Sequence, residues 1–252
     1  MDVLEIKCSN CGSTLDIEPG MVKGFCKYCG TPFVLQSKNG QNQMSVNIPE
    51  CLSLATQAEE STNFAEAIRL YDKILSVNPT LPEALAGKAF ASLTVFNLEK
   101  INAQYFAAGL NNAVKSAYSL GYDMTIFNAF MLDKSWSVMP YLVDFVFDKF
   151  MKEQSFNPRL AVYNFMENLF FMHHAHISFS NIVDSVSPIN PSQLYIDGYK
   201  ELKNTIITHC NLILEKAKEY RFGLDRQAVA GLKAHRDAAQ TCLRNFNRVY
   251  PN

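Results

Sequence analysis

Two pairs of cysteines near the N-terminus constrain the fold of this chain more than any other feature. Cys8 and Cys11 form the first Cys-x-x-Cys pair, and Cys26 and Cys29 form the second after fourteen intervening residues. Each pair points two thiolates at one spot, and a hairpin that brings the pairs together completes a tetrahedral set of sulfur ligands for one zinc ion. Four thiolates leave no open position for water or substrate. We therefore expect a structural zinc ion that contributes on the order of 10 kcal/mol to folding.

The residues around the cysteines favour short β-strands. Leu4 and Ile6 alternate with charged residues before the first pair, and residues 33–35 form an apolar run after the second pair. Such runs, bounded by glycine and proline, predict a small sheet around the metal. Residues 1–36 resemble a zinc ribbon, and ribbons of this kind often bind nucleic acid or large transcription assemblies. The alternative is a redox Cys-x-x-Cys, which needs one pair next to a strand–helix unit. Two pairs in a β context do not fit that arrangement.

The charge distribution makes the ribbon a poor nucleic-acid binder. Residues 1–36 carry three lysines against four carboxylates, and residues 37–199 carry ten basic against fifteen acidic residues. Residues 200–252 reverse the balance with ten basic and five acidic residues, in a chain whose net charge is −1. Phosphate binding is driven by clustered positive charge, which the net-acidic ribbon lacks.

The composition indicates a cytoplasmic protein. Cys51, Cys210 and Cys242 each lie in an apolar helical pattern, as buried thiols of a reducing compartment do. The first residues lack a basic segment followed by an apolar run, so we expect no signal peptide. Charged residues and histidines interrupt the most apolar stretches before they reach about 18 residues, so we expect no membrane span.

A polar, glycine-containing segment at residues 37–49 predicts a flexible linker, after which helical periodicity begins at Cys51. Ala67, Tyr71 and Pro79 lie at the spacing of the small, aromatic and terminal proline positions in the second helix of a tetratricopeptide repeat, which this segment resembles. Ala55 supplies the small residue of the first helix. The resemblance implies two antiparallel helices that approach closely.

A second unit that begins near Pro82 matches the repeat in part, with Ala86, Ala89 and Tyr105 at its small and aromatic positions. We therefore expect tetratricopeptide-like repeats over residues 50–122. In peptide-binding repeats the inner face of the first helix is polar, and the corresponding positions here are Leu52, Thr56 and Glu59. They lack the lysine and asparagine that clamp a C-terminal carboxylate, so the resemblance implies generic protein binding.

Residues 123–252 predict a divergent helical domain. We expect helix over residues 125–154 with a break at Met139-Pro140, and a second helical run from 158 to about 179. Two long helices at about 192–222 and 225–249 end the chain. These expectations complete a mostly α fold, with a β zinc ribbon, an α-solenoid of repeats and a divergent C-terminal part.

The last predicted helix is amphipathic. At 100° per residue, Arg226, Lys233, Arg244 and Arg248 lie along one side, opposite the apolar residues. One interpretation is a solvated outer face. The other is a contact surface for an acidic partner or a nucleic-acid backbone.

Three neighbouring histidines, His173, His174 and His176, invite a metal interpretation, because His173 and His176 share a helix face. No acidic residue completes a site, since Glu167 lies too far back along the helix, so we expect surface or partly buried histidines. The sequence contains no Gly-rich phosphate loop, no nucleophile elbow and no His-Glu-x-x-His.

These patterns predict a non-enzymatic protein-interaction adaptor. A structural zinc ribbon is tethered to a helical-repeat body whose concave side binds a protein segment. The alternative is a nucleic-acid-linked or transcription-associated regulator that uses the ribbon and the basic side of the last helix. A third hypothesis is an enzyme of unrecognised type within residues 121–191.

Overall fold

The computed structural model describes residues 7, 13–15, 23–26, 28, 32–34, 46–95 and 103–251. This part of the chain is mostly helical, as the sequence predicts. Two short strands, β1 (Lys23–Phe25) and β2 (Pro32–Val34), pair antiparallel with Gly24 opposite Phe33. An isolated antiparallel bridge joins Lys7 and Thr14.

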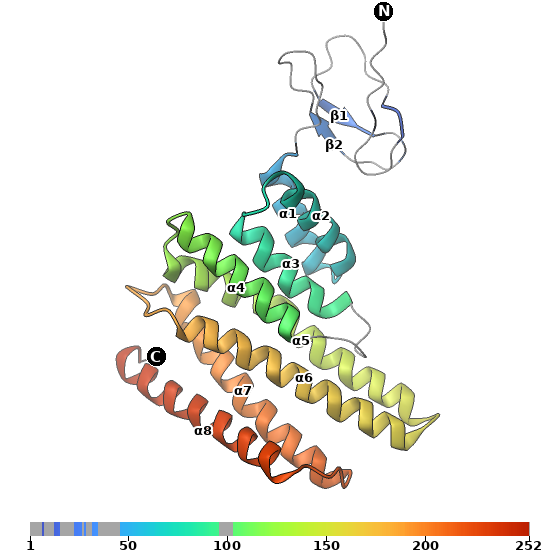
Figure 1. Cartoon of the computed structure of the whole chain (residues 1–252), viewed down its shortest axis with the longest axis vertical. Helices are drawn as coiled ribbons and strands as arrows, with labels where there is room; N and C mark the ends of the chain where they lie inside the picture. Colours follow the sequence, from blue (N-terminus) through green and yellow to red (C-terminus); the bar gives the residue numbers. More distant parts are fainter. Residues whose placement is uncertain are drawn as a thin grey trace, which may run out of the picture.

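Eight helices follow within the described residues. They are α1 (Ile48–Glu60), α2 (Phe64–Val77), α3 (Pro82–Val95), α4 (Ala103–Ser119), α5 (Met124–Gln154), α6 (Pro158–Asp184), α7 (Gln193–Glu219) and α8 (Arg226–Val249). Figure 1 shows them stacked broadly in chain order, with α1 and α2 at one end of the stack and α8 at the other. The buried apolar residues of all eight helices form one continuous core.

The first helix pair has the packing that the repeat resemblance implies. Ala55 and Ala67 are fully buried, which allows α1 and α2 to approach closely. Tyr71 is 1% exposed, and its ring lies where a Cβ on Gly87 of α3 would be, 2.2 Å from its Cζ atom. The ring of Tyr71 on α2 therefore requires a glycine at position 87 of α3.

The linker ends earlier than the sequence predicts. Helix α1 begins at Ile48, within the segment 37–49 that reads as a linker, and the side chain of Asn47 caps it by accepting a hydrogen bond from the Glu50 backbone N–H. Pro49 is compatible with this start because a proline in the first turn loses no helical hydrogen bond. The rest of the predicted linker, residues 37–45, lies outside the described residues.

The second unit differs from the prediction at its aromatic position. Tyr105 is 79% exposed, whereas the next residue, Phe106, is 3% exposed. Phe106 packs edge-on against Phe90 of α3 with 5.2 Å between ring centroids. Tyr105 is thus not the groove-filling residue, because α4 presents the neighbouring position to α3.

The predicted break at Met139-Pro140 is wrong, since Pro140 lies inside α5, which is one continuous helix of 31 residues. A proline inside a helix removes one hydrogen bond and leaves the carbonyl four residues earlier without its partner. Here that carbonyl belongs to Trp136, and both Trp136 and Pro140 are exposed. Water reaches this side of the helix, which lowers the cost of the missing bond, while Val138, Met139 and Leu142 hold the opposite side in the core.

Candidate functional site

The predicted zinc site is only partly described. Cys26 follows β1 directly and is 1% exposed, whereas Cys8, Cys11 and Cys29 lie outside the described residues. Within the described residues, no three His, Cys, Asp or Glu side chains are grouped as a metal ion requires. The four-thiolate site therefore remains a prediction from the sequence.

The inner face of α1 is covered by the chain itself. Lys134 of α5 donates hydrogen bonds to Glu59 Oε2 at 2.5 Å and to Thr56 Oγ1 at 3.1 Å. Tyr71 donates to the other carboxylate oxygen of Glu59 at 2.9 Å. These contacts occupy two of the three inner-face positions that the repeat resemblance assigns to peptide binding. Glu59 and Thr56 are thus held by contacts within the chain.

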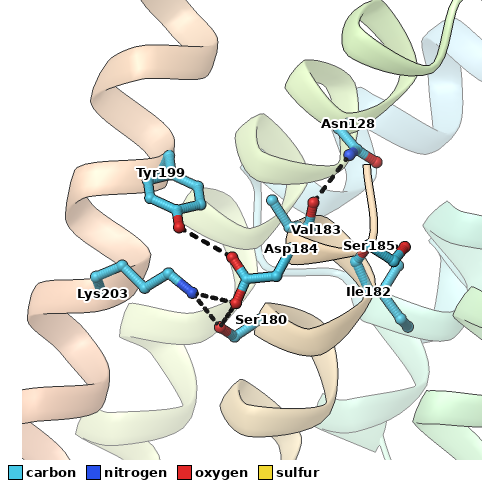
Figure 2. A network of polar contacts seen from close by, with 8 residues as sticks. All are labelled: Asn128, Ser180, Ile182, Val183, Asp184, Ser185, Tyr199 and Lys203. Atoms are coloured by element: carbon cyan, nitrogen blue, oxygen red, sulfur yellow. Dashed lines mark hydrogen bonds and ion pairs between the residues drawn. The ribbon is translucent and has the colours of Figure 1, made fainter. Parts of the chain in front are cut away.

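A second buried charge joins α6 to α7 (Figure 2). Lys203 donates hydrogen bonds to Asp184 Oδ2 at 2.5 Å and to Ser180 Oγ at 2.6 Å. Tyr199 donates to Asp184 Oδ1 at 2.9 Å, and the Lys203 ammonium lies 4.8 Å from the centre of the Tyr199 ring. Burial is the main cause that raises the pKa of Tyr199, and the Asp184 carboxylate adds to the rise.

The Ser180–Lys203 contact resembles a serine–lysine nucleophile pair, but the geometry does not support catalysis there. A lysine that acts as a base must be neutral, whereas Lys203 forms an ion pair with Asp184. Ser180 is 4% exposed and Lys203 is 2% exposed, so a substrate has no direct access to either group. The network instead fastens the C-terminal end of α6 to α7.

All five histidines of the chain lie close together on α6, α7 and α8. His173 Nε2 lies 2.9 Å from His235 Nδ1, which joins α6 to α8. The rings of His176 and His209 meet edge to face with centroids 4.6 Å apart, which joins α6 to α7. His176 Nδ1 donates to the carbonyl of Met172 at 2.7 Å.

Burial lowers the pKa of four of these imidazoles, those of His173, His176, His209 and His235. It is the largest cause of each shift, and it lowers the pKa of His173 to about 3, of His176 to about 4 and of His209 to about 3. His235 is less buried, and its pKa is lowered for the same reason. His209 Nδ1 is buried and has no hydrogen-bond partner in the described part of the chain. These rings are therefore held in their uncharged form at neutral pH.

A cavity of about 460 Å³ opens beside the His173–His235 pair. His173 and His174 on α6 and His235 on α8 line it, with Asp225 and Gln227 at the start of α8. Sequence reasoning found the histidines of α6 but not their partners on α7 and α8. Nothing in the spacing along one helix indicates which residues of another helix will face it.

The basic side of α8 is exposed as predicted. Arg226, Lys233, Arg244 and Arg248 all lie at the surface. Arg244 donates a hydrogen bond to Thr241 Oγ1 at 3.0 Å, and no ion pair is formed by any of the four within the described residues. The four cations face solvent, and the one carboxylate on the same side of α8, Asp237, is paired with Arg236.

No family model, curated protein or solved structure matches this chain. Among the described helices, none combines the length and the apolar character that crossing a membrane requires.

Proposed function

We propose that this chain is a non-enzymatic protein-interaction adaptor of the cytoplasm. Its helical body binds an acidic protein segment along the exposed basic side of α8, and its N-terminal zinc ribbon is a separately folded head. The observation that carries this proposal is the row of four exposed cations on the last helix of the stack, none of which forms an ion pair within the described residues. The covered inner face of α1 moves the binding surface away from the first repeat.

The position of α8 supports a role in binding. Helix α8 packs mainly against α7, and its buried residues are Leu232 and Ala239. Arg226 and Arg248 are 22 residues apart, which corresponds to about 33 Å along a helix axis. A partner segment of similar length that carries carboxylates would meet all four cations. Exposed charges at the edge of an interface mainly raise the rate of association and make that rate sensitive to salt.

The charge pattern favours an acidic protein segment over nucleic acid. The four cations are spread along the helix, and Asp237 lies on the same side among them. The region 37–199 has five more acidic than basic residues, which repels a polyanion more strongly than a short acidic segment. Nucleic-acid binding through the ribbon and α8 remains the alternative function, and the test below separates the two.

The proposed zinc ribbon is supported by the four cysteines of the two Cys-x-x-Cys pairs. In the sequence, Cys26 and Cys29 lie between the paired strands β1 and β2, and this order supports a hairpin that carries the second cysteine pair. Zinc bound by Cys8, Cys11, Cys26 and Cys29 would be structural, because four thiolates fill its coordination.

The binding surface is tested by charge reversal with a matched control. The triple variant Arg226→Glu/Arg244→Glu/Arg248→Glu is compared with Lys115→Glu/Lys152→Glu/Arg159→Glu, whose three cations are also exposed but lie on α4, α5 and α6. Both variants change the net charge equally. Binding is measured at low and high salt with a fluorescent Glu-rich peptide and with DNA and RNA oligonucleotides.

We expect salt-sensitive peptide binding that the α8 variant loses and the control variant keeps. If the oligonucleotides bind with this sensitivity and the peptide does not, the nucleic-acid alternative replaces the proposal. If neither probe binds the wild-type chain at low salt, the basic side of α8 is only a solvated face and the proposal fails.

A further inference from the structure

The histidine pair between α6 and α8 has the spacing of two ligands of one ion. His173 and His235 are 62 residues apart in sequence, yet their facing nitrogens are 2.9 Å apart. Two imidazole nitrogens on a tetrahedral zinc ion, with bonds of about 2.0–2.1 Å, lie about 3.3 Å apart. A movement of a few tenths of an ångström thus converts the hydrogen-bonded pair into a bidentate site.

We propose that His173 and His235 bind a divalent late transition metal ion, zinc in the first place, at the wall of the cavity between α6 and α8. Imidazole is a preferred ligand of zinc, copper and nickel ions. The site is distinct from the predicted ribbon, because its donors are nitrogens and it lies on the helical body. It also does not depend on the basic side of α8.

The surroundings of His173 orient its free lone pair. The Sγ atom of Cys210 lies 3.9 Å from His173 Nδ1, on the side of the ring away from His235. With the ring proton on Nδ1, the lone pair of Nε2 points at His235. Binding of the ion then requires that the proton of His235 move from Nδ1 to Nε2. Both facing nitrogens then present a lone pair to the metal ion. Partners at the second ring nitrogen commonly fix the tautomer of metal-binding histidines.

The remaining coordination positions face the cavity. Because no group of three candidate ligands is assembled in the described residues, the two imidazoles are the protein's contribution in this geometry. His174 and Asp225 line the same cavity without completing the set. Water would take the other positions, and such open positions distinguish this site from a closed four-thiolate site.

The test is zinc titration of the full-length chain by calorimetry, together with the visible spectrum of the cobalt-substituted protein. Wild type is compared with His235→Ala, with His235→Cys and with the control His209→Leu. The control also loses one histidine, but one that does not line the cavity. Circular dichroism checks that each variant is folded.

We expect wild type to bind one metal ion beyond any thiolate-bound ion, without thiolate-to-cobalt absorption from this second ion. His235→Ala weakens this binding by about tenfold or more, since even loss of an outer partner costs 10- to 100-fold. His209→Leu leaves the binding unchanged. His235→Cys keeps the site and adds thiolate absorption, a change that a purely structural histidine would not produce.

Two results would overturn the proposal. One is that wild type binds no ion beyond the thiolate-bound one. The other is that His235→Ala and His209→Leu bind the second ion equally, which would assign it to other surface groups. Should His235→Ala fail to fold, the cobalt spectra of wild type and His235→Cys decide the question.

Discussion

Lys134 Nζ lies 2.5 Å from Glu59 Oε2, in an ion pair whose side chains are 7% and 1% exposed. The pair joins the N-terminal half of α5 to the last turn of α1, 75 residues away in sequence. It supplies the counter-charge of a buried carboxylate whose other side-chain partner is the Tyr71 hydroxyl. The same lysine also contacts Thr56, so it occupies two of the three positions at which a tetratricopeptide repeat would hold a peptide.

Removing the charge of Lys134 alone should lower the free energy of unfolding more than removing the charges of both Lys134 and Glu59. Lys134→Met leaves the Glu59 carboxylate buried with the Tyr71 hydroxyl as its remaining partner, and we expect a loss of about 3–5 kcal/mol in the free energy of unfolding. In Glu59→Gln/Lys134→Met the amide oxygen still accepts from Tyr71 and no charge is buried. Urea denaturation should show the double variant to be more stable than Lys134→Met alone. Additive losses would mean that the two residues are not coupled.

Two glycines of the helical body should respond oppositely to alanine. A Cβ on Gly87 would lie 2.2 Å from Tyr71 Cζ, so Gly87→Ala displaces a buried ring and should cost about 1–3 kcal/mol. Nothing lies within 4 Å of a Cβ on Gly231 in α8, so Gly231→Ala should stabilise the helix by about 0.5–1 kcal/mol. Thermal denaturation measures both changes. A neutral Gly87→Ala would contradict the close packing of α2 on α3.

Acid should destabilise the helical body through its buried histidines. The pKa is about 4 for His176 and about 3 for His209, against 6.5 for an ordinary histidine. Below that ordinary value the unfolded chain takes up protons that the folded chain refuses. The stability is therefore complete above pH 6.5 and falls as the pH drops toward the folded values, by up to about 1.4 kcal/mol per pH unit for each histidine.

His209→Leu separates this effect from the titration of carboxylates. The variant removes one buried imidazole, so its stability should fall less steeply than that of wild type between about pH 6.5 and pH 4. At neutral pH it should be at least as stable as wild type, because the unpartnered Nδ1 of His209 is removed, and a buried polar atom without a partner costs about 1–3 kcal/mol. Equal pH slopes in urea denaturation would show that His209 does not titrate as described.

Cys26→Ser should separate the ribbon from the body. Loss of one thiolate releases zinc and unfolds residues 1–36, because binding of the metal supplies most of the folding free energy of such a small unit. The helical signal of residues 51–249 should stay nearly intact in circular dichroism, while elemental analysis shows the loss of zinc. A large loss of helix would show that the ribbon and the body fold as one unit.

Local patterns in the sequence predicted most of the helices. The apolar stripe around Tyr71 and the long amphipathic helix with Arg226 and Arg248 both follow from interactions within one turn or two of the chain. The cap at Asn47, which begins α1 inside the predicted linker, was not predicted. The helix break predicted at Pro140 is wrong. The free-energy cost of a proline inside a helix depends on whether the carbonyl that it leaves unbonded faces water or the core. The sequence analysis placed Tyr105 at the buried aromatic position, which Phe106 occupies in the structure. The rotation of α4 against α3 decides which of the two neighbours is buried.

The sequence by itself determined the class of the fold, the amphipathic sides of the helices and the cysteine quartet at the N-terminus, because each depends on spacing along the chain. Only the tertiary structure decided that Lys134 covers the inner face of α1 and that five histidines meet on α6, α7 and α8. Those contacts depend on the angles and offsets at which helices cross. Many small packing contributions distributed over the whole core set these angles, and no single segment carries them.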